Sequence, residues 1–86
     1  MIKGTTTSGF KFEISEDLFD DFELVELYAK VDKSIIYIGD LAEKLLGVDQ
    51  KKALAEHVRR EDGRVSTTDM IKELTEIEAA IPGSKN

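Results

Sequence analysis

The chain has 86 residues, with 12 basic and 18 acidic side chains and a net charge of −6. The acidic balance disfavours nucleic acids and anionic membranes as partners, because binding phosphate requires clustered lysines and arginines. There is no cysteine, which excludes disulfides and thiolate metal sites, and no apolar run reaches the roughly 18 residues of a membrane span. The length predicts one domain, residues 1–86, whose small core a homo-oligomer would extend.

The N-terminal segment, residues 2–14, has the pattern of a β-hairpin. Residues 2–7 are rich in β-forming side chains, and residues 10–14 alternate between apolar and polar. Thr7, Ser8 and Gly9 lie between the two runs and predict a short loop that contains glycine. We expect the apolar members of the second strand to face the helices: Phe10, Phe12 and Ile14.

The remainder of the chain predicts about four helices from the spacing of its apolar residues. Gly47 and Gly63 mark two helix ends, because only glycine enters the left-handed region without a steric penalty. Ser66, with Asp69 three residues later, resembles a capping box at the start of the last helix. The expected fold is therefore α+β, an N-terminal β-hairpin packed on a small bundle of about four α-helices. The expected helices are residues 16–32, 34–46, 49–61 and 66–81, followed by a frayed tail at 82–86.

The first of these helices has an unusually wide apolar surface. One stripe contains Phe22, Val25 and Ala29, and the neighbouring stripe contains Leu24, Tyr28 and Val31. An amphipathic surface helix needs an apolar stripe of only about 100°. Either the helix is sandwiched between the hairpin and the other helices, or part of its surface is reserved for a partner. Every charged residue between Glu13 and Ala29 is acidic, which suits either a solvated face or a patch for a basic partner.

The sequence predicts no catalytic, cofactor-binding or metal site. His57 is the only histidine, and no serine lies in a G-x-S-x-G nucleophile elbow. We expect His57 to be a partly buried helix residue. The acidic residues lack the D-x-D-x-D-G spacing of a calcium loop. The chain is therefore not expected to be an enzyme.

A small helix-turn-helix DNA-binding regulator is the alternative prediction. Residues 41–57 are similar to that motif in small repressors, but Ala42 and Gly47 are five residues apart instead of four. One extra residue rotates the turn by about 100° relative to the packing face. The second helix of the motif would offer these side chains to DNA: Gln50, Lys51, Lys52, Arg59 and Arg60.

Three segments together resemble the tail assembly chaperones of long-tailed phages and prophages of Gram-positive bacteria. They are DFELVELYAKVD, LAEKLLGVDQKKALAEHVRREDGRVS and the helix that ends in ELTEI. The likeness is firmest at Asp21-Phe22-Glu23-Leu24, at Leu45 to Gly47 and at Glu61 to Val65. It implies a transient factor that coats the tape-measure protein, recruits tail-tube subunits and is then displaced. This chain would be the short form, which in that family commonly accompanies a longer, frameshifted one.

The expected partners are therefore the tape-measure protein and the major tail (tube) protein, in the cytoplasm of the host bacterium and not in the mature virion. A chaperone for a helical protein needs exposed apolar grooves that accept amphipathic helices. We expect the contact to be made by side chains of the first helix and the start of the second: Phe22, Leu24, Leu27, Tyr28 and Ile36.

Overall fold

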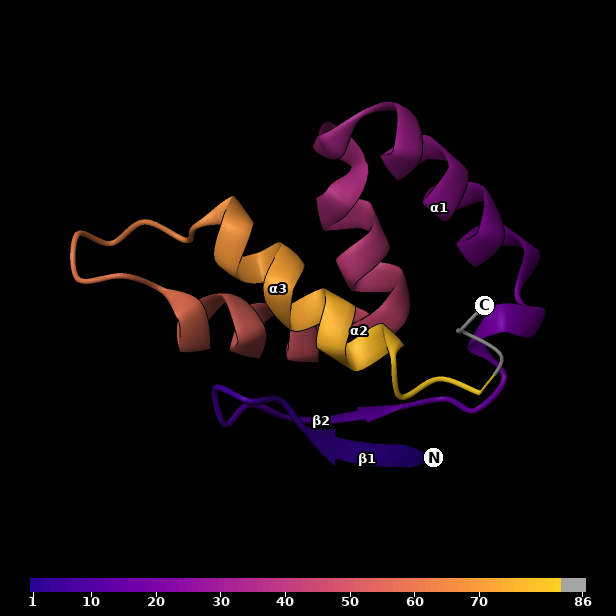
Figure 1. Ribbon diagram of the computed structural model, residues 1–86, viewed down its shortest axis with the longest axis horizontal. Helices are drawn as coiled ribbons and strands as arrows, with labels where there is room; N and C mark the ends of the chain where they lie inside the picture. The colour runs from indigo at the N-terminus through magenta and orange to yellow at the C-terminus, as the bar shows by residue number, and fades with distance from the viewer. Residues whose placement is uncertain (83–86) are drawn as a thin grey trace.

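The structure, a computed structural model, describes residues 1–82 (Figure 1). It is an α+β fold, as predicted, with one two-stranded antiparallel sheet. Two 3-10 helices, η1 and η2, precede the first and second α-helices. The elements in chain order are β1 (Ile2–Thr5), β2 (Lys11–Ile14), η1 (Leu18–Asp20), α1 (Phe22–Lys33), η2 (Ile35–Tyr37), α2 (Ile38–Val58) and α3 (Thr67–Glu78). Of the predicted tail, residues 83–86 lie outside the described part of the chain.

The predicted hairpin is confirmed. Strands β1 and β2 pair antiparallel, with Ile2 opposite Ile14 and Thr5 opposite Lys11. The loop closes through a bond from the Thr6 N–H to the Phe10 carbonyl and another from the Gly9 N–H to the Thr6 carbonyl, each 2.9 Å. Gly9 has a φ of 96°, which a residue with a side chain would rarely adopt.

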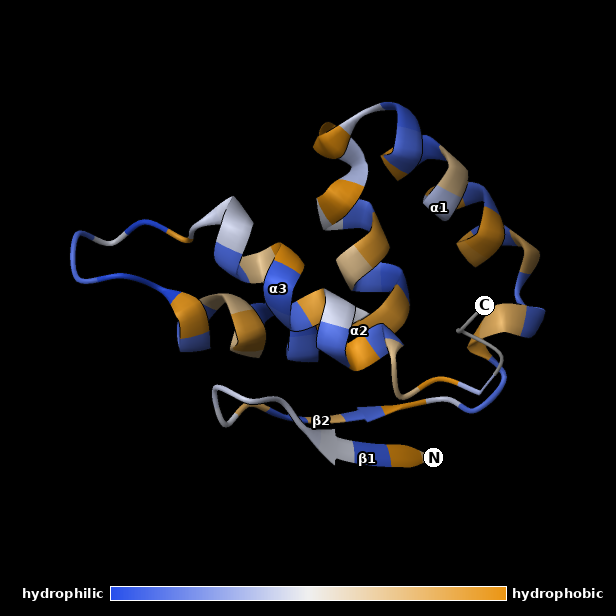
Figure 2. Ribbon diagram, in the orientation of Figure 1, coloured by the Kyte–Doolittle hydropathy of each residue, from blue (hydrophilic) through white to orange (hydrophobic). Residues whose placement is uncertain are grey.

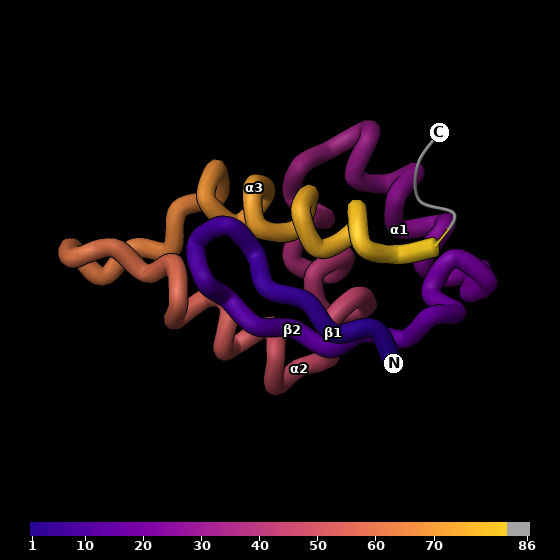
Figure 3. Tube along the Cα trace, turned by 60° about the horizontal axis from the view of Figure 1, so that its bottom comes forward, coloured from indigo at the N-terminus to yellow at the C-terminus, as the bar shows by residue number. Residues whose placement is uncertain are grey.

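The apolar face of the hairpin covers the helices, as expected. Phe10, Phe12 and Ile14 are all buried, and Figure 3 shows the hairpin lying across α2 and α3. The Phe12 ring rests on Gly4, where an added Cβ would lie only 2.6 Å from the Phe12 Cζ atom. Glycine is therefore required at position 4 for the ring to lie flat across the strand.

The outer edge of β2 is occupied at Glu13 by a side chain of α2. The Glu13 N–H donates to Gln50 Oε1 at 2.8 Å, and Gln50 Nε2 donates to the Glu13 carbonyl at 2.7 Å. The side-chain amide thus makes the pair of bonds that a neighbouring strand would make. This contact fixes the hairpin to the middle of α2.

The first main helix begins later than predicted, at Phe22 instead of residue 16. Asp21 has an extended backbone, and its side chain accepts a 2.9 Å bond from the Glu23 N–H, which makes it the N-cap. The hydroxyl of Ser15 accepts only from the Asp17 N–H, a local turn. Buried Leu18 instead anchors the short helix η1 to the core. The sequence contains two good N-cap residues, Ser15 and Asp21, within seven positions, which explains why the start of the helix was mispredicted.

The prediction of about four helices is wrong, since the described chain has three. Gly47 does leave helical geometry, at φ 81° and ψ 166°, but the residues on both sides of it are helical. The expected second and third helices are therefore the two halves of the kinked helix α2, which ends at Val58 instead of residue 61. Both α1 and α3 pack against α2.

Helix α3 begins as predicted, because the Ser66 hydroxyl accepts from the Asp69 N–H at 3.2 Å. It ends at Glu78, before the predicted residue 81. No helix within residues 1–82 is long and apolar enough to cross a membrane. One apolar core joins the hairpin, η1 and the three helices: Phe10, Phe12, Ile14, Leu18, Leu24, Leu41, Ala42, Leu45, Leu46, Leu54, Leu74, Ile77 and Ile81.

Candidate functional site

Helix α1 turns one of its two apolar stripes toward solvent. We call Phe22, Val25 and Ala29 the outer stripe; the Phe22 side chain is 73% exposed and Val25 48%. Figures 1 and 2 show α1 at the edge of the molecule, on the far side of α2 from the hairpin. The idea that α1 is sandwiched between the hairpin and the other helices is therefore wrong. Its outer stripe is free to contact another molecule.

The other stripe of α1 packs into the core. Leu24 has no exposed surface, and Leu27, Tyr28 and Val31 are half-buried against the core residues. Leu24 was expected to touch a partner, and this expectation is wrong. Its position faces α2, so no partner can reach it while the chain is folded.

Tyr28 is also held inside the fold. Its hydroxyl donates to Glu78 Oε2 at 2.8 Å, and its ring lies 5.6 Å from the ring of Phe19. Burial, and then the neighbouring Glu78 carboxylate, raise the pKa of the Tyr28 phenol. The residue ties α1 to the end of α3, with only part of its ring at the surface.

Ile36 is the most exposed of the predicted contact residues, at 79%. It lies in η2, where the Ser34 hydroxyl caps the turn by accepting from the Ile36 N–H. Its neighbour Ile35 is 48% exposed. The structure thus leaves Phe22 and Ile36 open to solvent at opposite ends of α1, with Leu27 only partly accessible between them.

The acidic segment beside the outer stripe is partly neutralised by one lysine. Lys44 of α2 lies 3.1 Å from both Asp21 and Glu23. Its hydrogen bond lowers the pKa of the Asp21 carboxyl, and the two carboxylates raise the pKa of Lys44. This bridge fixes the start of α1 on the first half of α2.

A polar cluster that the sequence did not predict lies under the hairpin loop. The Ser8 Oγ atom lies 3.0 Å from His57 Nε2 and donates to Glu73 Oε2 at 2.8 Å. We call Ser8, His57 and Glu73 the hairpin clamp, because it joins the loop to α2 and α3. The three residues are so far apart in sequence that no local pattern connects them. His57, expected to be partly buried, is exposed, and the buried member is Glu73.

The hairpin clamp does not have the geometry of a catalytic pair. A serine hydroxyl has one proton, and here it is donated to the Glu73 carboxylate. His57 must therefore donate its Nε2 proton to Ser8 instead of accepting one, the reverse of a general base. No group of three or more histidine or acidic side chains among residues 1–82 is arranged to bind a metal ion.

The helix-turn-helix alternative is disfavoured by what its basic side chains contact. Gln50 is occupied by β2, and three of the four cations already meet carboxylates, whereas Lys52 makes no ion pair within residues 1–82. The pairs are Lys51 with Glu43 at 3.3 Å, Arg59 with Glu56 at 2.6 Å and Arg60 with Asp69 at 3.1 Å. Each pair would have to break before its cation could bind a phosphate.

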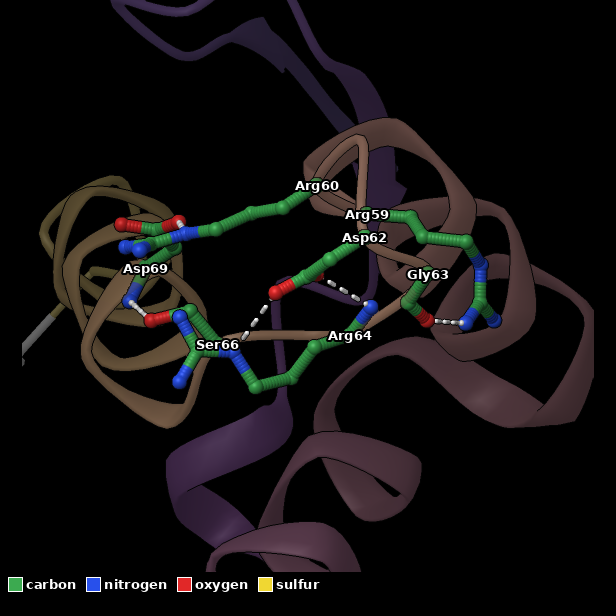
Figure 4. Close-up of polar contacts among 7 residues, drawn as sticks. All are labelled: Arg59, Arg60, Asp62, Gly63, Arg64, Ser66 and Asp69. Atoms are coloured by element: carbon green, nitrogen blue, oxygen red, sulfur yellow. Dashed lines mark hydrogen bonds and ion pairs between the residues drawn. The ribbon is translucent and has the colours of Figure 1, made fainter.

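Polar contacts join the residues of the turn from Arg59 to Ser66 (Figure 4), which protrudes from the body of the molecule in Figure 1. Arg59 donates to the Gly63 carbonyl, and the Asp62 carboxylate accepts from the Arg64 N–H at 2.9 Å. Gly63 has a φ of 89°, the left-handed conformation expected of it, but the helix that it was expected to end stops earlier, at Val58. The turn lies at the opposite end of the molecule from α1 (Figure 1).

Comparison of the chain with protein-family models, curated proteins and solved structures finds no match in any of the three.

Proposed function

We propose that the chain is a non-enzymatic tail assembly chaperone of a long-tailed phage or prophage. In this role it binds the tape-measure protein and recruits tail-tube subunits. The observation that carries the proposal is the outer stripe of α1, an exposed apolar strip that includes a phenylalanine. An amphipathic helix of the tape-measure protein would lay its own apolar face on this strip.

The segments of the resemblance lie at positions that suit the proposal. Asp21 caps α1, Phe22 belongs to the outer stripe and Leu24 anchors the helix in the core. The acidic side chains beside the outer stripe, such as Glu23 and Glu26, keep this apolar surface in solution. Because exposed charges at the edge of a contact add little affinity, a bound chaperone can be displaced. Many copies along one long helix would gain strength through multivalency.

The first test is co-expression with the long helical protein encoded beside the gene, followed by size exclusion with light scattering. We expect the long protein to become soluble and to elute with many copies of this chain. Separate elution, with the long protein still aggregated, would overturn the proposal.

Point variants then test which surface is used. Phe22→Asp and Ile36→Asp should each weaken binding at least tenfold, because they place a charge where an apolar side chain is expected. Aspartate in the first turn suits the helix dipole, so Phe22→Asp should leave α1 folded. Val48→Asp, at a residue 53% exposed beyond the kink of α2, is the matched control. Equal binding by all three variants would exclude this surface. Leu24 is unsuitable for the test, because a charge at its buried position would unfold the chain.

A further inference from the structure

The solvent side of α1 carries a second pattern beside the outer stripe. Glu23, Glu26, Lys30 and Lys33 are all exposed and form what we call the charged edge. At about 100° per residue, these positions occupy one strip along the helix, directly next to the outer stripe. From the N-terminus to the C-terminus the edge therefore reads acid, acid, base, base.

The charged edge is mostly unpaired within the molecule. Glu26, Lys30 and Lys33 form no ion pair with residues 1–82, and Glu23 shares Lys44 with Asp21. Lys30 lies over the Tyr37 ring, 5.7 Å from its centre. These side chains are therefore available to a partner that approaches the outer stripe.

We propose that the partner covering the outer stripe in the free protein is a second copy of this chain, with the two α1 helices antiparallel. In an antiparallel pair the same edges of the two helices meet, in reversed order. The acids of one charged edge then face the bases of the other. In a parallel pair the charged edge would instead meet the opposite edge of the second copy, which would bring Glu23 and Glu26 close to Asp21, an unfavourable contact.

The apolar residues fit the same arrangement. With the two-fold axis at the level of Leu27, Val25 of each copy lies beside Ala29 of the other, the pairing of an antiparallel coiled coil. The small Ala29 side chain allows close approach, and Phe22 packs at each end. The opposite edge of the stripe carries Asp21 and Asp32, and Lys44 offsets the first of these charges.

The contact extends over one helix of 12 residues, about 18 Å. A contact of this length buries less surface than the interfaces of stable dimers, which bury about 1,600 Å². Monomer and dimer therefore exchange, and a helical partner can displace the second copy from the outer stripe. The inference concerns the chain alone and does not depend on the identity of that partner.

Sedimentation of the purified chain over a wide concentration range tests the inference. We expect the mass to rise from one chain toward two, and to stay at one chain in Val25→Asp but not in Val48→Asp. A wild-type mass of one chain at every concentration overturns the proposal. So does a dimer that Val25→Asp leaves intact.

Charge reversal tests the antiparallel orientation. Glu26→Lys and Lys30→Glu should each weaken the homodimer at least tenfold, because each places like charges opposite one another. A mixture of the two variants should form a heterodimer, and the double variant Glu26→Lys/Lys30→Glu should recover the homodimer. High salt should weaken both the heterodimer and the homodimer of the double variant, because it screens the charges. A double variant that remains a monomer, or singles that dimerise like wild type, overturn the arrangement.

Discussion

Gly47 is the residue at which α2 changes direction. Its φ of 81° and ψ of 166° lie in a region that is essentially restricted to glycine. An added Cβ would meet nothing within 4 Å, so the space around it is open. The cost of a side chain there is therefore one of backbone strain alone.

We predict that Gly47→Ala lowers the free energy of unfolding by about 1–3 kcal/mol. Gly39 lies in the helical part of α2, where a Cβ would be 3.8 Å from Lys51 Nζ, an ordinary contact. Gly39→Ala should therefore stabilise the chain, by about 0.5–1 kcal/mol. Urea unfolding of both variants checks the pair. If the two substitutions changed the free energy of unfolding equally and in the same direction, the kink at Gly47 would not require glycine.

Tyr28 provides a second test at the residue scale. Because its phenol has a pKa raised above the ordinary value of 10.0, the unfolded chain ionises first as the pH rises. The stability that this residue contributes is thus complete below pH 10.0 and is lost as the pH rises through the folded-state pKa.

In a Tyr37→Phe background, Tyr28 is the sole tyrosine, and its ultraviolet absorbance reports its ionisation directly. We expect phenolate to appear well above pH 10.0, and closer to that value when Glu78→Gln removes the neighbouring charge. Ionisation of Tyr28 at its ordinary pKa in the folded protein would contradict the contact with Glu78.

The hairpin is the element whose attachment depends most on polar contacts. Beyond the hairpin clamp, Thr7 donates both its N–H and its hydroxyl to Glu76 Oε1, at 2.7 and 2.9 Å. Glu73 is only 5% exposed, and its Oε1 atom has no hydrogen-bond partner within residues 1–82. The carboxylate therefore relies on Ser8 for its one hydrogen bond.

Ser8→Ala should cost about 1.5–3 kcal/mol, because it leaves a buried carboxylate without a donor. Hydrogen exchange should show faster opening at the Thr6 and Gly9 amides, which close the loop. Thr68→Ala, at an exposed hydroxyl of α3, is the control and should change stability little. Similar losses of stability in Ser8→Ala and Thr68→Ala would mean that the hairpin clamp does not stabilise the fold.

Sequence patterns predicted the local features of these elements well. The hairpin loop, its buried face and the Ser66 cap all follow from residues within five positions of one another. The start of α1 was mispredicted because Ser15 and Asp21 are both good caps, and the choice depends on where Leu18 reaches the core. The clamp and the burial of Leu24 could not be predicted, because both depend on the packing of residues far apart in the chain.

At the scale of the whole molecule, surface ion pairs make the stability depend on pH. Lys44, Arg59 and Arg60 lower the pKa of their partner carboxyls, Asp21, Glu56 and Asp69 respectively. Because the folded-state pKa values are lowered, these groups bind protons more readily in the unfolded chain. Their contribution is fully present above the ordinary values of 3.8 and 4.5, and is lost as the pH falls through the lowered values.

We therefore expect unfolding to become easier below about pH 4, and to do so less steeply in Lys44→Met, which removes one of the pairs. Urea midpoints measured between neutral and acidic pH check this, and added salt should weaken the effect because the pairs are at the surface. A Lys44→Met variant with the acid sensitivity of wild type would contradict the role of this bridge.

The contact between Gln50 and Glu13 has a consequence for how the sheet can grow. On the outer side of β2 the N–H and C=O groups of Glu13 are bonded to Gln50, whereas those of Lys3 and Thr5 on the outer side of β1 have no such partner. A strand of another molecule that added to β2 would first have to displace the Gln50 amide, but one that added to β1 would meet open groups. A glutamine side chain thus makes edge-to-edge growth of the sheet less favourable at β2 than at β1.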